Sequence, residues 1–158
     1  MKPSIEQTLS REERVALFPG SFNPFTRGHA SIVERGLRIF DRIVIALGVN
    51  PEKAEDVSQR DTELDIIRRL YADEPRIEVA AYSGLTVDAA REHGAKFILR
   101  GVRSVKDFEY ERDMADVNRK LSGIETVILY SLPELSAVSS SVVRELEKYG
   151  ADLAEFLP

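Results

Sequence analysis

The sequence contains no cysteine and only two histidines among its 158 residues. The absence of thiols excludes disulfide bonds, thiolate nucleophiles and thiolate metal sites. With so few imidazoles as well, a zinc site is not expected.

Long apolar runs and an excess of positive charge are also missing. No stretch approaches the roughly 20 apolar residues that a membrane-spanning helix needs. The N-terminal MKPSIEQTLSREER is polar and lacks the apolar centre of a secretion signal, so we expect a cytoplasmic protein. A net charge of −5 argues against a nonspecific nucleic-acid binder, although a local cluster of cations can still hold a small anionic ligand.

The residues that are present suit one globular domain. Hydrophobic residues make up 43% of the chain and charged residues 31%, and the length allows one domain with a substantial core. We expect a polar N-terminal extension over residues 1–13 and a single domain over residues 14–158.

Short apolar runs rich in valine, isoleucine and phenylalanine alternate with longer helical patterns. The runs predict five strands, over 14–18, 42–49, 76–82, 96–100 and 125–132. The patterns predict five helices, over 29–40, 59–73, 85–93, 106–121 and 139–149, with a polar loop over 50–58. This alternation predicts an α/β, Rossmann-like domain, in which helices cover both faces of a five-stranded parallel sheet. Gly94 and Gly150 are expected to end helices, and Phe108 and Met114 to pack inward.

The expected sheet has one place where a ligand would bind. Open parallel sheets bind ligands at the carboxyl ends of their strands, where the strand order reverses. For the order 3-2-1-4-5, this point lies between the first and fourth strands. The segments that leave these strands are PGSFNPFTRGH, residues 19–29, and RGVR, residues 100–103.

The first segment has the residues of a phosphate-binding turn. Gly20 allows a positive φ or a close approach of the backbone, and Gly28 leaves room beside the first turn of a helix. His29 would then lie where free N–H groups and the helix dipole favour an anion. The segment is neither a Walker loop nor a G-x-G-x-x-G fingerprint. The alternative is an ordinary strand-to-helix turn with a surface histidine.

The second segment brings two guanidinium groups to the same edge of the sheet. Arg100 and Arg103 flank a glycine and can converge on a polyphosphate, or they can form a solvated charge pair. Lys53, after the second strand, could reach the same crevice, although taken alone it fits a solvated surface residue.

Three further features stand elsewhere in the chain. Glu111 could accept hydrogen bonds from ribose hydroxyls, whereas its acidic neighbours fit a solvated face. Serines at 139–141 open the last helix, where they can cap it or bind phosphate. His93 fits a structural cation at a helix C-terminus.

Together these segments resemble a known family. PGSFNPFTRGH resembles the T/H-x-G-H signature of the nucleotidyltransferase superfamily, and VSSSVVRE resembles its second signature. ILRGVRSVKDFEYERDMADVNRKL is similar to the segment that distinguishes the phosphopantetheine adenylyltransferases of bacterial coenzyme A biosynthesis. The resemblance runs from about residue 14 to residue 158.

The resemblance implies a reaction and a set of residues. In this family the 4′-phosphate of phosphopantetheine attacks the α-phosphorus of ATP, which gives dephospho-coenzyme A and pyrophosphate. By resemblance, His29 stabilises the transition state, with Lys53 and Arg103 as further catalytic residues. The residues implied for phosphopantetheine are Ser21, Lys53, Thr86 and Arg100. Those implied for ATP are Ser21, Phe22, His29, Gly101, Val102, Arg103, Glu111, Leu135, Ser136, Ala137, Val138, Ser139, Ser140 and Ser141.

The resemblance also implies partners. Magnesium is expected to arrive bound to ATP, because no compact carboxylate cluster is evident that would hold it beforehand. The family forms homohexamers, and no nucleic acid or membrane partner is expected.

Three positions depart from the family pattern. Ser21 stands where threonine is commoner but keeps a hydroxyl, Asn23 replaces a usual aspartate, and Leu135 occupies a place where a bulky aromatic often occurs. The nearest alternative is an adenylyltransferase acting on nicotinate mononucleotide, in which GSFNP also occurs. An alternative of another class is a noncatalytic nucleotide-sensing module on the same fold.

Overall fold

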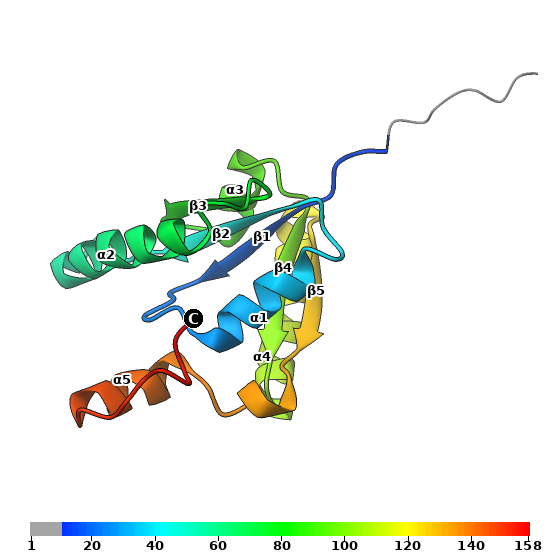
Figure 1. Cartoon of the computed structure of the whole chain (residues 1–158). Helices are drawn as coiled ribbons and strands as arrows, with labels where there is room; N and C mark the ends of the chain where they lie inside the picture. The colour runs from blue at the N-terminus through cyan, green and yellow to red at the C-terminus, as the bar shows by residue number, and fades with distance from the viewer. Residues whose placement is uncertain (1–10) are drawn as a thin grey trace, which may run out of the picture.

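The computed structural model describes residues 11–158, including all side chains in that range except those of residues 54–56. Strands and helices alternate along this part of the chain (Figure 1). The elements are β1 (Val15–Gly20), α1 (Arg27–Gly36), β2 (Arg42–Gly48), α2 (Ala54–Leu70), β3 (Ile77–Tyr82), α3 (Thr86–Glu92), β4 (Phe97–Val102), α4 (Val105–Ser122), β5 (Glu125–Tyr130), a short 3-10 helix η1 (Pro133–Leu135) and α5 (Ser140–Lys148).

The five strands form one parallel sheet in the order β3-β2-β1-β4-β5, which confirms the predicted topology. The central strands are covered on both faces, and Leu17, Ile43 and Val44 have no exposed surface. A strand buried on both faces needs apolar residues at every position, because both sides of the pleat face the core. For this reason β1 and β2 are continuous apolar runs in the sequence.

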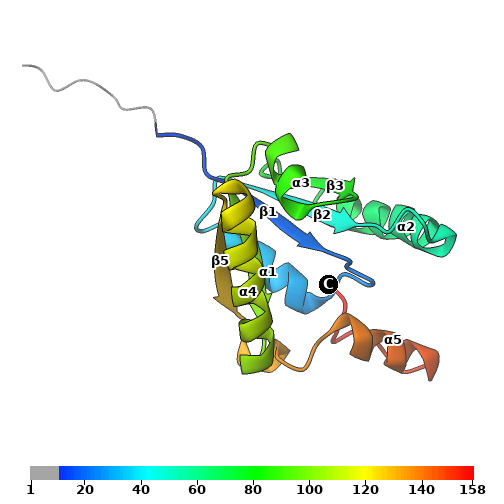
Figure 2. The same ribbon diagram turned by 180° about the vertical axis from the view of Figure 1, so that it is seen from behind.

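Helices cover both faces of the sheet. On one face, Val33 from α1 and Ile67 from α2 are fully buried in a cluster with Phe18 and Ile45. On the other face, Val87 from α3 packs in a second cluster. Figures 1 and 2, which view the molecule from opposite sides, show α1 and α4 on opposite faces. Each fully buried aliphatic side chain contributes about 1.5–3 kcal/mol, so these helix faces hold the layers together.

The predicted helix ends agree with the structure where glycine marks them. Gly94 and Gly150 follow α3 and α5 with φ angles of 68° and 71°, a conformation that glycine adopts without strain. His93 caps α3, and its Nδ1 lies 2.8 Å from a carboxylate oxygen of Glu78, as a structural histidine would.

The bounds of two helices differ clearly from the prediction. The expected loop over 50–58 is mostly helix, because α2 begins at Ala54 rather than at residue 59. The apolar pattern detects only the part of α2 that packs, around Leu64 and Ile67, and misses the turns before it. Helix α1 begins two residues earlier than expected and ends at Gly36, and Phe40 is buried after the helix has ended.

Two strands run further than predicted. β1 continues through Pro19 and Gly20, and β4 continues through Gly101 and Val102, because each of these residues pairs with the neighbouring strand. The predicted inward packing of Phe108 and Met114 is wrong, since both side chains are more than one third exposed on α4.

The two ends of the described chain are held by different kinds of contact. Arg11 and Glu13, in the expected polar extension, form ion pairs with Asp41 and Arg42, while residues 1–10 of that extension lie outside the described residues. At the other end, the segment after α5 returns to the start of α1, where the Arg27 N–H donates to the Phe156 carbonyl at 2.8 Å. Within residues 11–158, no helix combines the length and apolar character needed to cross a bilayer.

Candidate active site

A cavity of about 320 Å³ opens where β1 and β4 separate, at the predicted reversal of the strand order. Its walls come from the end of β1 and the loop after it, the first turns of α1, α4 and α5, and the end of β4. The parallel sheet therefore brings the two predicted segments, 19–29 and 100–103, to one cavity.

His29 lies in the first turn of α1 and is fixed by its N-cap residue. The backbone N–H of Thr26 donates to His29 Nδ1 at 2.9 Å, and the His29 N–H lies 3.4 Å from Thr26 Oγ1. This reciprocal pair is a capping box in which histidine replaces the usual glutamate or glutamine. Because an amide N–H can only donate, Nδ1 accepts, and the neutral imidazole carries its proton on Nε2.

The ring of His29 is neutral at physiological pH. Burial, which is the largest cause, and the positive charges of Arg100 and Arg103 together lower the pKa of His29 from 6.5 to about 4. The ring packs against Phe22 and Phe25, with centroid distances of 4.9 Å and 5.4 Å. His29 is thus a rigid, uncharged hydrogen-bond donor.

Gly20 permits this packing. A Cβ at Gly20 would approach the Phe22 ring to within 2.7 Å, so the close approach expected of this glycine is present. The positive φ of the turn belongs instead to Phe22, at 43°. Phe22, expected at the ATP, lines the cavity, but its side chain is 2% exposed and mainly supports His29.

Arg100 and Glu111 form a two-point ion pair in the cavity wall. Arg100 Nε donates to Glu111 Oε2 at 2.9 Å, and Nη2 donates to Oε1 at 2.6 Å. A third donor, Nη1, binds the Pro19 carbonyl. Both residues lie where the prediction requires, but each already has a protein partner: Glu111 is 7% exposed, and both of its oxygens are occupied.

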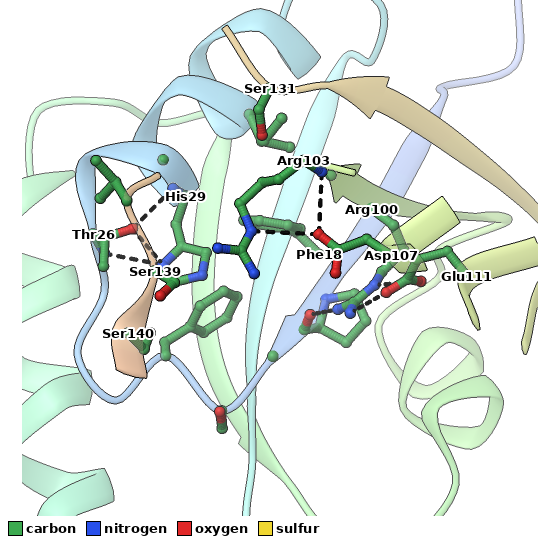
Figure 3. A pocket seen from close by; sticks show the side chains of 18 of the residues that line it. Phe18, Thr26, His29, Arg100, Arg103, Asp107, Glu111, Ser131, Ser139 and Ser140 are labelled. Atoms are coloured by element: carbon green, nitrogen blue, oxygen red, sulfur yellow. Dashed lines mark hydrogen bonds and ion pairs between the residues drawn. The ribbon is translucent and has the colours of Figure 1, made fainter. Parts of the chain in front are cut away.

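Arg103 enters the cavity between His29 and the Arg100–Glu111 pair (Figure 3). Its Nε lies 3.4 Å from Asp107 Oδ2, and its backbone N–H donates to the same oxygen at 3.2 Å. Asp107, in the first turn of α4, thereby holds Arg103 at the end of β4. The exposed guanidinium remains accessible to a ligand.

The serines at the start of α5 bind other parts of the protein through their hydroxyls. Ser139 caps α5 by accepting from the Val142 N–H at 3.2 Å, and Ser140 donates to the Pro24 carbonyl at 2.7 Å. Ser141 accepts from Arg144 at 3.2 Å. The Ser140 bond attaches α5 to the loop after β1, whereas the other two bonds lie within α5 and its cap.

The first turns of α1 and α5 leave three backbone amides free at the cavity. Within residues 11–158, no hydrogen-bond acceptor contacts the N–H of Gly28, Ser140 or Ser141, and all three residues line the cavity. They lie in the first turns of α1 and α5, where free N–H groups and two helix dipoles favour an anion.

The remaining predicted residues divide into two groups. Ser21, Gly101 and Val138 line the cavity, and Thr86 lines an adjoining one of about 230 Å³. Those placed outside both cavities are Lys53, at the exposed N-cap of α2, buried Val102, and Leu135, Ser136 and Ala137, around η1.

The sequence interpretation missed several residues of the site. Thr26 and Asp107 orient His29 and Arg103, and Phe18, Ile32 and Ser131 also line the cavity. Thr26 was detectable, because threonine three residues before a polar helix residue has the spacing of a capping box. Asp107 gave no signal that separated it from its acidic neighbours.

The described residues contain no group of three or more histidine, aspartate or glutamate side chains that could hold a metal ion. The carboxylates at the cavity, Asp107 and Glu111, are each paired with an arginine. The chemistry available here is therefore anion binding and hydrogen-bond donation.

Comparisons with known proteins show which family the chain resembles. The cytidylyltransferase-like family model matches residues 17–146. The phosphopantetheine adenylyltransferase of Bacteroides thetaiotaomicron is 52% identical over 145 residues, which are 92% of this chain and 95% of that protein. The enzyme of the same name from Porphyromonas gingivalis is 52% identical over 147 residues, 93% and 95% of the two chains.

A solved structure shares the fold at much lower identity. The crystal structure of a putative nicotinate-nucleotide adenylyltransferase from Vibrio parahaemolyticus superposes with a TM-score of 0.61 at 15% identity, covering 92% of this chain and 94% of the other. At this identity the likeness concerns the fold alone. The family-model match and the two relatives, which span nearly the full length, show that the chain belongs to the cytidylyltransferase-like family and, within it, to the phosphopantetheine adenylyltransferases.

Proposed function

We propose that the chain transfers the adenylyl group of ATP to 4′-phosphopantetheine, giving dephospho-coenzyme A and pyrophosphate, as a cytoplasmic step of coenzyme A biosynthesis. The observation that carries this proposal is the convergence of His29 and Arg103 with three free helix amides on one cavity. The name that the two relatives share supports the choice of acceptor.

The cavity beside His29 suits the phosphates of ATP. The free amides of Gly28, Ser140 and Ser141 would bind phosphate oxygens, and the Arg103 guanidinium would bind them from the opposite wall. His29 Nε2–H would donate to the α-phosphate. The other residues that the family resemblance implies for ATP would lie around the α-phosphate or next to such residues in the sequence.

The adjoining cavity suits the acceptor. It shares Ser21, Arg100 and Glu111 with the first cavity, and it extends toward Tyr82 and Thr86. A phosphate at the shared wall would lie beside Ser21 and Arg100, with its organic arm along Thr86. Lys53 would reach this phosphate with its long, flexible side chain, as the family resemblance implies.

This arrangement fits a direct phosphoryl-type displacement. The attacking phosphate is already ionised at neutral pH, so no general base is needed. The attacking oxygen forms a bond to the α-phosphorus while the bond to the bridging oxygen breaks, and pyrophosphate leaves with that electron pair. The protein contributes in-line positioning and donors for the charge that develops on the α-phosphate, where the fixed His29 donor lies.

Magnesium belongs to the substrate in this proposal. The described residues offer no carboxylate cluster to hold it beforehand, so it would enter bound to the phosphates of ATP. There it would neutralise charge on the leaving pyrophosphate.

The test of the proposed function is a choice between acceptors. With ATP and magnesium, the purified chain is expected to form dephospho-coenzyme A from phosphopantetheine and no product from nicotinate mononucleotide. The shared fold does not separate these acceptors. Product from nicotinate mononucleotide alone would overturn the proposal. No product from either, with ATP still bound, would favour a nucleotide-sensing module.

A variant of His29 is the control for this assay. His29→Ala removes the Nε2 donor, and we expect turnover to fall by about two to three powers of ten with little change in ATP affinity, as for a donor aimed at the transition state. A parallel loss of binding and turnover would instead give His29 a role in holding ATP.

We also propose that the chain forms a homo-oligomer, a hexamer by resemblance to its family. Helix α4 exposes Val117 and Leu121, and Tyr110 and Met114 precede them at helical spacing on the same side. An exposed apolar row of this kind is typical of a helix that packs against another subunit.

A further inference from the structure

Helix α2 holds the loop that precedes His29 through one carboxylate. Oε1 of Glu63 accepts from the backbone N–H of Phe25 at 2.8 Å. Glu63 is half-buried, and this burial raises the pKa of its carboxyl, while the Phe25 amide acts in the opposite direction. The bond joins residues that are 38 positions apart in the sequence.

Phe25 is also held to α2 by its ring, which is 2% exposed. The ring packs edge-on against Tyr71, at the end of α2, with a centroid distance of 6.1 Å. The same ring contacts the imidazole of His29 at 5.4 Å and the ring of Phe22 at 5.3 Å. Phe25 therefore lies between α2 and His29, and the Glu63 bond anchors its backbone.

The hydrogen bond from Phe25 to Glu63 affects His29 because the next amide along the chain binds the imidazole. The Phe25 N–H donates to Glu63, and the next amide along the chain, that of Thr26, donates to His29 Nδ1 at 2.9 Å. The two amides flank a single Cα atom. A rotation of the Phe25 backbone would turn the Thr26 N–H away from the imidazole.

We propose that Glu63 is a positioning residue for His29: by holding the Phe25 amide, it keeps the Thr26 N–H on Nδ1 and so keeps the Nε2 proton directed into the cavity. This inference rests on the proposed function, because it concerns the same reaction. Glu63 itself lies outside both substrate cavities.

Glu63 has one competing role. It lines a small cavity of about 110 Å³ that also contains Ser21, Asn23 and Arg60. Through this cavity it could shape the acceptor side instead of His29. The two roles differ in the kinetic constant that they affect.

The test compares two substitutions of Glu63. Glu63→Gln keeps an oxygen that accepts from Phe25, whereas Glu63→Leu removes the acceptor and fills a similar volume. We expect kcat to fall about tenfold or more in Glu63→Leu, with both KM values within about twofold, because small displacements of a reacting group are costly. Glu63→Gln should stay near the parent. Asp65→Ala, which removes an exposed carboxylate from the same helix, is the matched control and should change nothing.

A second readout does not need activity. The chain has only two histidines, so ¹⁵N NMR of labelled histidine is readily assigned with a His29 variant. We expect the parent and Glu63→Gln to show His29 with its proton on Nε2, and Glu63→Leu to show a mixture of tautomers. Since this readout is independent of turnover, an incorrect acceptor assignment would leave it unchanged.

Three results would overturn the inference. The first is a folded Glu63→Leu variant with an unchanged tautomer and an unchanged kcat. The second is a Glu63→Leu variant in which only the KM for phosphopantetheine rises. The third is a loss of kcat in Glu63→Gln equal to that in Glu63→Leu. If Glu63→Leu does not fold, Glu63→Ala is measured in its place by the same NMR experiment.

Discussion

The protonation state of His29 follows from three local features. Its burial and the two nearby guanidinium groups keep the ring neutral, and the Thr26 amide selects the tautomer. A neutral imidazole with its proton on Nε2 can donate to an oxyanion, but it cannot change its charge as the pH varies around neutrality. The residue therefore suits stabilisation of phosphate charge better than proton transfer.

This state of His29 predicts how stability depends on pH. The pKa is 6.5 in the unfolded chain and about 4 in the folded one, so between these values the unfolded state binds more protons. The contribution of His29 is fully present above pH 6.5 and is lost as the pH falls toward about 4. From about pH 7 to about pH 4.5, the free energy of unfolding should fall by roughly 2 kcal/mol more in the parent than in His29→Gln. Urea denaturation of both proteins at the two pH values measures this difference, and equal losses would show that His29 is not held neutral.

The sequence indicated which residues lie at the site, but it did not indicate which side chains they pair with. Residue types and position in the fold were sufficient to select His29, Arg100 and Arg103. The pairing of Arg100 with Glu111 was not predictable, because it depends on how α4 lies against β4. Patterns along one helix do not report such contacts.

Helix α4 follows β4 directly, and its first two turns hold the arginines at the end of that strand. Asp107 holds Arg103, and one turn later Glu111 holds Arg100, so two carboxylates on one helix orient two guanidinium groups. The Arg100–Glu111 pair is the more buried of the two, and its geometry is that of a two-point fork. Helix α4 is thus a support for the cations of the site.

Removing one charge of this pair tests the support. In Glu111→Gln one acceptor oxygen remains, and we expect the free energy of unfolding to fall by about 1–3 kcal/mol, because a partly buried guanidinium loses its counter-charge. We also expect a higher KM for phosphopantetheine, since Arg100 loses its orientation. Glu109→Gln, at an exposed position of the same helix, is the control. A rise confined to the KM for ATP would instead assign Glu111 to the ribose, as the family resemblance implies.

The elements themselves were largely predictable, and their ends were not. All five strands and five helices stand in the predicted order, because buried parallel strands and amphipathic helices differ in apolar period. The start of α2 was missed, since the sequence of its first residues, AEDVS, has no apolar pattern. The ends of β1 and β4 were missed, since Gly20 and Gly101 pair as strand residues despite a composition typical of turns.

The assembled domain leaves one helix face uncovered. On α4 the side chains of Val117 and Leu121 are 47% and 54% exposed, although the sequence pattern suggested a helix packed on its own domain. Within the described residues, nothing covers this row. The sequence pattern predicted the fold, but it does not report how one copy of the chain would pack on another.

The uncovered row predicts assembly. We expect light scattering to give a mass several times 17.8 kDa, near six times that value for the proposed hexamer. The double variant Val117→Glu with Leu121→Glu should have a lower mass, because charges would replace the apolar contact. Val142→Glu, at an exposed apolar position of α5, should leave the mass unchanged. A monomeric parent, or a double variant of unchanged mass, would contradict this assignment of α4.

The two ion pairs at the cavity have a consequence for ligand entry. Arg100 is matched by Glu111, Arg103 by Asp107, and the imidazole is uncharged, so the lining residues have no net formal charge despite two arginines. An arriving triphosphate therefore meets no excess of positive charge, and it would bind through the donors that the ion pairs leave free, at Arg103 and at the helix amides. Selection of a nucleotide in this cavity would thus depend on the directions of individual donors, and an anion without matching acceptor positions would gain little from the two arginines.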